Sequence, residues 1–371
     1  MTLSSRGVAG LRAPATSPAN EPPEPGAAPH GKSAVAAGLS AGWGRGLLLA
    51  LLVAFAVPTG LSLYGDFGDV SATLAGFQWG MMPAILGLTA VNYLVRYLRW
   101  RRLVELATGR IPPLREDLLV FFAGTAMIFT PARLGEWMKS HYARELYGAP
   151  VARTAPIPLA ERLADCLVML LLASAGLVLF DWGGIVFAVV GAAAAATIVA
   201  LRHRGLASLV VRGLRRLPPA RRLLPSVEEF NESSRLLFSL PGLSWALGLG
   251  LVAWSLECLT FFLVLVGLGR ATTWELLVQA AFIFPIATLA GTLSLLPGGI
   301  GVTEGGITGM TQAVVGAPRN VAAASALLVR AVILGFGFAL GLVALAVLGR
   351  ATLGHQAITR DRDSVATDSH R

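Results

Sequence analysis

The sequence predicts an all-α polytopic membrane protein, with about six full crossings and two re-entrant segments arranged as an inverted repeat. Three observations predict this fold class. Of the 371 residues, 55% are hydrophobic and only 14% are charged, whereas soluble domains carry about 25% charged residues. Several apolar runs approach or exceed the roughly 20 residues that span a hydrocarbon core. The chain also matches itself, charged residues included, after a shift of 168 positions.

The two ends of the chain differ from its middle. Residues 1–40 are rich in Pro, Ala, Gly and Ser without an apolar period, which predicts a disordered N-terminal tail. A signal peptide is not expected, because no apolar core follows the basic start. The membrane-embedded domain is expected over 41–350, and the mixed-charge segment 351–371 is expected to be a loose C-terminal tail.

Arginine placement predicts the orientation of the crossings. The connections 99–116 and 202–240 are rich in arginine, whereas 65–76 carries acidic residues and no basic one. The positive-inside rule therefore places the two basic connections and the N-terminus in the cytoplasm. This explains the net charge of +9, and no nucleic-acid partner is expected. The predicted crossings are 46–64, 78–98, 156–180, 183–201, 243–268 and 321–349.

Two further apolar segments are interpreted as re-entrant. Segment 117–130 has about 14 residues, which is short for a crossing. Segment 276–296 is long enough, but Pro285 interrupts it and it ends in "LPGGIG". Proline removes a backbone donor and glycine loosens a helix. A full crossing by 276–296 is the alternative, and it would place the C-terminus outside.

The internal match needs no gap. In such a composition, alanine, glycine and leucine match by chance. The shift, however, aligns three consecutive residues and also a glutamate before them and an arginine after them, which favours a true repeat. The halves extend over about 78–180 and 243–349, with three predicted crossings between the two copies. An odd number inverts the second copy, as in many transporters. The shift brings Glu136 onto Glu304, Gly148-Ala149-Pro150 onto Gly316-Ala317-Pro318, and Arg162 onto Arg330.

Ionisable residues inside the predicted crossings need partners, because each costs a few kcal/mol in the bilayer. Arg330 is predicted to pair with Glu304, and Arg162 with Glu136 by symmetry. Arg162 also meets Asp165 at a spacing of i, i+3 on a helix. Two interpretations remain open. The pairs brace the re-entrant segments, or they line a polar cavity where the halves meet, which the symmetric placement favours.

Other polar residues are less informative. Glu257 lies in a crossing without an evident partner. The sequence contains no HExxH, CxxC or GxxxxGK[ST] motif, so neither a metal site nor a cofactor is expected. The cysteines, Cys166 and Cys258, lie in apolar runs, which favours simple packing. Interfacial or topology-setting roles are predicted for Arg96, Arg99, Arg101, Arg102, Trp137, Tyr142 and Tyr147.

Four motifs carry a family resemblance: "NYLVRYLRWRRL" (92–103), "TPARLGEWMKS" (130–140), "ERLAD" (161–165) and "LPGGIGVTEGG" (296–306). From about Gly46 to Gly349, the sequence resembles the transmembrane, flippase-like region of lysylphosphatidylglycerol synthases, including stand-alone members without the synthase domain. The resemblance implies movement of a lipid between leaflets. In the synthases an aminoacyl-transfer domain would follow. Only about 20 residues follow here, so aminoacyl transfer is not expected.

A lipid translocator needs cations to hold phosphate, acids to balance those cations, and a groove open to lipid. Arginine is well shaped for phosphate, and glycine lets backbone N–H groups face a headgroup. The expected cations are Arg133, Lys139, Arg162 and Arg330. The expected acids are Glu136, Glu161, Asp165 and Glu304. The expected backbone donors are Gly298, Gly299 and Gly301.

The leading hypothesis is a flippase-like translocator of the bacterial inner membrane, moving a phospholipid or a polyprenyl or isoprenoid-type lipid. Its expected partners are membrane lipids and a lipid-modifying enzyme. An integral-membrane enzyme with Glu136 or Glu161 as general base is one alternative. A scaffold subunit of a lipid or cell-envelope modification pathway is another. We expect no catalysis, because no nucleophile, base and orienting group can be recognised together.

Overall fold

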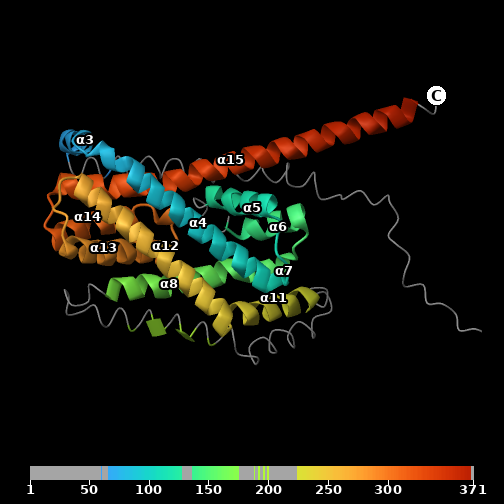
Figure 1. Cartoon of the computed structure of the whole chain (residues 1–371), viewed down its shortest axis with the longest axis horizontal. Coiled ribbons are helices and arrows are strands. Elements are labelled where there is room, and N and C mark those ends of the chain that lie inside the picture. The colour runs from blue at the N-terminus through green and yellow to red at the C-terminus, as the bar shows by residue number, and fades with distance from the viewer. Residues whose placement is uncertain are drawn as a thin grey trace, which may run out of the picture. The chain divides into compact units, whose positions relative to one another are not determined.

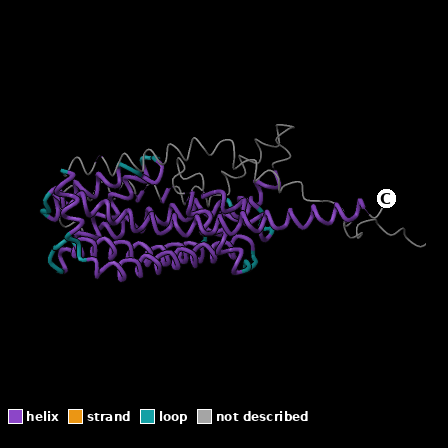
Figure 2. The backbone as a smooth tube through the Cα atoms, turned by 90° about the horizontal axis from the view of Figure 1, so that it is seen from above, coloured by secondary structure: helices purple, strands orange, loops and turns teal. Residues whose placement is uncertain are grey.

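The structure is a computed structural model that describes residues 66–127, 136–174 and 224–368, together with residues 60, 188, 191, 192, 195, 196 and 199. The elements in this part of the chain are helices joined by short loops, which confirms the all-α class (Figures 1 and 2). The helices up to the middle of the chain are α3 (Phe67–Ala75), η1 (Trp79–Met81), α4 (Met82–Thr108), α5 (Leu114–Ala126), α6 (Met138–Tyr147), α7 (Val151–Thr154) and α8 (Pro156–Ala173). The later ones are α11 (Leu224–Leu237), α12 (Leu240–Gly267), α13 (Trp274–Leu293), η6 (Pro297–Gly299), α14 (Val302–Val315) and α15 (Arg319–Asp368).

Four helical segments in the described residues are long and apolar enough to cross a membrane: Trp79–Thr108, Leu240–Gly267, Trp274–Leu293 and Arg319–Leu348. Three of them coincide with predicted crossings. Most of the predicted crossings 46–64 and 183–201 lies outside the described residues. The number of crossings therefore stays a prediction.

Helix α13 differs from the expected segment 276–296. The helix continues unbroken through Pro285, instead of being interrupted there, and it is long enough to cross. The physical reason is local. Proline within a helix removes one backbone hydrogen bond, whereas a full break inside an apolar core would leave several backbone groups without partners. The chain turns only after Leu293, where positive φ values occur at Leu295, Gly298 and Gly299.

The repeat is visible in the local structure. Helices α6 and α14 both end at a glycine in the left-handed region, Gly148 with φ 71° and Gly316 with φ 64°. After each glycine the next alanine donates its backbone N–H to the carbonyl six residues earlier, at 3.2 Å in the first copy and 3.3 Å in the second. Both copies therefore end a helix with the same turn, which a shift of 168 positions superimposes.

Each copy also contains a helical hairpin whose second helix returns towards the end at which the first began. In the first hairpin, α5 and α6, the Tyr147 hydroxyl donates to Asp117 Oδ1 at 3.1 Å. In the second, α13 and α14, Gln279 Nε2 donates to the carbonyl of Val314 at 3.1 Å. These contacts join the open ends of the hairpins and leave the turns as their tips.

The two hairpins begin at opposite ends of α4. The first follows directly after α4 ends at Thr108. The second begins shortly after α12, whose last residue, Gly267, accepts a hydrogen bond from the N–H of Gln78, just before η1 and α4. Figure 1 shows α13 and α14 towards one end of α4, and α5 and α6 towards the other.

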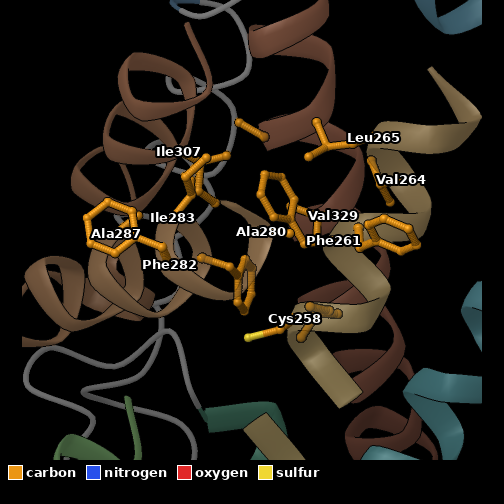
Figure 3. Close-up of a cluster of buried hydrophobic side chains, with 14 of the residues drawn as sticks. Cys258, Phe261, Val264, Leu265, Ala280, Phe282, Ile283, Ala287, Ile307 and Val329 are labelled. Carbon is orange, nitrogen blue, oxygen red and sulfur yellow. The ribbon is translucent and has the colours of Figure 1, made fainter. Parts of the chain in front are cut away.

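Apolar side chains of α12, α13, α14 and α15 form the main core, together with part of α8. Figure 3 shows Phe261, Phe282, Ile283 and Val329 converging in this cluster. Cys258 is buried in the same core, as expected, and the half-buried Cys166 packs against it. This core holds the second hairpin against α12 and α15.

Helix α15 extends further than the sequence predicted. It continues to Asp368, whereas a loose tail was expected over 351–371. Helix propagation adds one hydrogen bond per residue without a new nucleus, so an existing long helix extends readily into a polar segment. The expected N-terminal tail, 1–40, lies outside the described residues.

Candidate functional site

A cavity of about 90 Å³ lies between the two hairpins and helices α4, α8, α12 and α15. This volume has room for a few water molecules. The lining is charged to an unusual degree for a site between apolar helices, where each ionised group is costly unless it is paired. The charged lining residues are Arg96, Arg99, Glu136, Lys139, Glu161, Arg162, Glu257 and Arg330.

The predicted ion pair of the first copy is present. Arg162 Nη2 lies 3.3 Å from Glu136 Oε2, and Arg162 Nη1 lies 3.4 Å from Asp165 Oδ2 within the same helix. The Arg162 side chain keeps 26% of its surface exposed, and its Nε is buried without a hydrogen-bond partner. The pair is therefore formed, but the guanidinium is incompletely satisfied.

The predicted ion pair of the second copy is also present, and it is tighter. Arg330 Nε donates to Glu304 Oε1 at 2.8 Å. The second oxygen, Oε2, accepts from the N–H of Gly301 at 2.6 Å. Arg330 Nη2 donates to the carbonyl of Gly298 at 2.5 Å. Both carboxylate oxygens and two guanidinium nitrogens are thus engaged inside the protein.

This geometry corrects the role expected for the glycines. Gly298, Gly299 and Gly301 were predicted to present N–H groups to a headgroup. For two of them the structure differs, because the Gly299 N–H donates to the carbonyl of Leu296 at 2.9 Å and the Gly301 N–H donates to Glu304 Oε2. Gly299 has φ 66° and Gly301 has φ 88°, conformations that suit glycine. The glycine turn therefore serves the Glu304–Arg330 pair directly.

Arg99 contradicts its predicted interfacial role. Its side chain is 2% exposed, and Nη1 lies 2.6 Å from Asp165 Oδ1. Nε lies 3.6 Å from Glu161 Oε1. The indole N–H of Trp254 also donates to Asp165 Oδ1 at 3.0 Å. Arg99 is thus a central cation of the site, and it joins α4 to α8.

Arg96 likewise belongs to the site, where it supplies the partner that Glu257 lacked in the sequence. Arg96 Nη2 lies 2.7 Å from Glu257 Oε1. The guanidinium stacks over the Trp254 ring at 5.1 Å, and the Asn92 amide donates to Glu257 Oε1 at 3.0 Å. A signal was present in the sequence, because Asn92, Arg96 and Arg99 follow the i, i+4, i+7 spacing of one helix face.

Lys139 is buried, although its helix was expected at the membrane interface. Its Nζ lies 3.6 Å from Glu161 Oε2. The ammonium also sits over the rings of Trp100 at 4.9 Å and Phe121 at 5.1 Å. Its stem passes over Gly124, where an added Cβ would clash with Lys139 Cγ. The last predicted cation, Arg133, lies outside the described residues.

The charges around the cavity balance. In the described part of the chain, five cations contact five acids, so the cluster is neutral when every group is ionised. Such a cluster holds several positive groups at membrane depth without a large uncompensated charge. The cations are Arg96, Arg99, Lys139, Arg162 and Arg330, and the acids are Glu136, Glu161, Asp165, Glu257 and Glu304. Across the same described residues, no cluster of three or more His, Cys, Asp or Glu side chains is arranged to hold a metal ion.

Comparison with known proteins agrees with the resemblance seen in the motifs. Residues 42–341 match the family described as the lysylphosphatidylglycerol synthase TM region. The chain belongs to this family. It is therefore an integral membrane protein of a lipid-related family. The match includes both hairpins and both ion pairs.

A curated relative of this lysylphosphatidylglycerol synthase TM-region protein is a "UPF0104 membrane protein" of Methanothermobacter thermautotrophicus. The two are 36% identical over 95 residues, which is 26% of this chain and 27% of the relative. The aligned part thus spans about a quarter of the relative's length. This relative is also a membrane protein, and its name does not indicate a substrate.

Proposed function

We propose that this protein moves phosphate-bearing lipids between the leaflets of a bacterial cytoplasmic membrane. One observation carries the proposal: five cations, three of them buried and two partly exposed, line a cavity between two hairpins that begin at opposite ends of α4, and five acids balance them. A lipid phosphate crossing hydrocarbon needs cations at depth, and arginine suits phosphate oxygens. The acids stabilise those cations while no headgroup is bound.

The opposite starting points of the hairpins support an inverted repeat in the membrane. At one end of α4, Asn320 Nδ2, near the start of α15, donates to Thr73 Oγ1 in the acidic segment 65–76 at 2.9 Å. At the other end of α4, the Ser233 hydroxyl, from the basic connection 202–240, donates to the carbonyl of Arg153 at 2.6 Å. If the basic connections are cytoplasmic, as the positive-inside rule predicts, α5 and α6 enter the membrane from the cytoplasm, and α13 and α14 enter it from outside.

Transport would need no covalent step in this protein. The charged groups bind the headgroup and release it on the other side, while the acyl chains stay in the hydrocarbon. A lipid-modifying enzyme that supplies or consumes the lipid is the natural partner. Its identity would decide which lipid is moved.

The decisive test is the exchange of a fluorescent phospholipid between the leaflets of proteoliposomes. The informative variant is Arg96→Gln with Glu257→Gln. It removes both members of an ion pair that lines the cavity, so no unpaired charge is left behind. The matched control is Arg102→Gln with Glu105→Gln, an ion pair on the same helix whose side chains are 40% and 32% exposed.

We expect exchange per folded molecule to fall at least about tenfold in the cavity variant, since charge-assisted hydrogen bonds to phosphate are lost. The control should exchange at the wild-type rate. Formation of a chemically altered lipid would favour the enzyme hypothesis. Equal exchange by empty and protein-containing vesicles would favour the scaffold hypothesis.

A further inference from the structure

A second cavity, of about 170 Å³, lies beside the central one; we refer to it as the side cavity. It is formed by the residues that precede α6, by the first turns of α8, and by the end of α13 with its following turn. Glu136 and Arg162 line both cavities, so their ion pair stands at the boundary between the two. The full lining is Glu136, Trp137, Pro158, Leu159, Arg162, Thr292, Leu295 and Leu296.

The outer part of the side cavity is apolar and open. Leu295 is 67% exposed, Trp137 47% and Leu296 46%. In a membrane-embedded chain, large apolar side chains that no protein covers face lipid chains. Leu295 is also held at φ 56°, a conformation that residues with a side chain rarely adopt because it is strained. The turn thus keeps a leucine at this opening despite local strain.

The inner end of the side cavity is cationic. Arg162 lies six residues beyond Pro156, the start of α8, which is about 9 Å along the helix. Its acidic neighbour Asp165 is already held by Arg99 at 2.6 Å, closer than the 3.4 Å to Arg162. The Arg162 Nε has no hydrogen-bond partner. Arg162 therefore has donor capacity for an additional anion.

We propose that the side cavity is a lateral binding site for the phosphate group of a membrane lipid, which pairs with Arg162 while its acyl chains remain outside between Leu295, Leu296 and Trp137. Glu136 leaves Arg162 as the phosphate arrives, and this opens the boundary to the central cavity. The proposal rests on the lipid transport proposed above, for which the side cavity is the lateral access. A lipid that enters from the side needs an apolar opening for its acyl chains and a cation for its phosphate. The side cavity offers both, and it lies next to the charged central cavity.

Site-specific photocrosslinking tests the proposal in intact protein. A photoreactive phenylalanine analogue replaces Leu296, which lines the side cavity, or Leu293, which is 59% exposed on the same hairpin but does not line it. The vesicles contain equal amounts of phosphatidylglycerol and uncharged galactosyl diacylglycerol with identical chains. Mass spectrometry identifies the lipid attached to the protein.

At position 296 we expect phosphatidylglycerol to be enriched about tenfold over the galactolipid, the ratio expected for one charged hydrogen bond. At position 293 the ratio should match the membrane. Enrichment should vanish in Glu136→Gln with Arg162→Gln, a variant that leaves neither member of the pair alone. Arg162→Lys should keep part of it, because the cation remains while the guanidinium geometry is lost.

Three outcomes would overturn the side-cavity proposal: equal ratios at positions 296 and 293, enrichment that persists in the double variant, and loss of enrichment on adding inorganic phosphate. The third would assign the cavity to free phosphate. Leaflet exchange in the same vesicles separates this proposal from the proposed function. Enrichment without exchange would retain the site and refute transport, whereas exchange without enrichment would do the reverse.

Discussion

The two ion pairs occupy equivalent positions, 168 residues apart, yet they have different surroundings. Glu304 and Arg330 are 6% and 9% exposed and 2.8 Å apart, and the backbone of the glycine turn completes their hydrogen bonds. Glu136 and Arg162 are 3.3 Å apart, and Arg162 is 26% exposed. Arg330 reaches only the central cavity, and protein groups complete the hydrogen bonds of its pair, whereas Glu136 and Arg162 border both cavities.

Their neighbours explain the difference. Lys139, Glu161 and Asp165 surround the first pair with further charges. A shift of 168 positions replaces these three residues by Ile307, Val329 and Ile333, which are buried in the apolar core. A pair in an apolar setting must satisfy itself completely, whereas a pair among other charges can exchange partners. The repeat therefore uses one motif as a brace and the other as a working site.

The largest contrast should appear in stability. Arg330→Gln leaves Glu304 charged in an apolar interior, and we expect a loss of about 3–5 kcal/mol, as for broken buried pairs. Arg162→Gln should cost about 1–2 kcal/mol, because Arg162 is partly exposed and Asp165 keeps Arg99. Thermal unfolding of purified protein in detergent, followed by size-exclusion chromatography, measures both. Equal losses would contradict the assignment of brace and working site.

Neutral double variants should separate folding from transport. Glu304→Gln with Arg330→Gln strands no charge, so folding should recover relative to Arg330→Gln, and exchange should fall by no more than about threefold. Glu136→Gln with Arg162→Gln should also fold, but exchange per folded molecule should fall at least about tenfold. Proteoliposome exchange, normalised to folded protein, gives the comparison. The opposite ranking would make the second pair the working site.

A smaller effect should arise at the glycine turn that holds the brace. Gly301→Ala places a side chain at φ 88°, and we expect a loss of about 1–2 kcal/mol in unfolding free energy. Gly309→Ala, within α14 and with open space around its Cβ position, should be neutral or stabilising by up to about 1 kcal/mol. Unfolding in detergent again gives the readout. A neutral Gly301→Ala would show that the Gly301 conformation does not limit the stability of the brace.

Some of the site could be predicted from the sequence, and the reason is local. Glu136, Arg162, Glu304 and Arg330 were found as pairs, because a gap-free shift and helical spacing relate them. Arg99 was missed, because an arginine at the end of an apolar helix satisfies the positive-inside rule equally well at the interface. Its burial depends on α8 and α12, which cover that face of α4.

The membrane character, the helical class and the repeated helix–Gly-Ala-Pro–helix turn were determined by the sequence itself, because they depend on composition and on residues a few positions apart. Tertiary structure alone decided which charges meet. Arg99 reaches Asp165 across 66 positions, and Arg96 reaches Glu257 across 161. Such contacts follow from how helices pack and which side chains they remove from solvent, and no local pattern specifies that. The same packing made one copy of the motif a closed brace and left the other between two cavities.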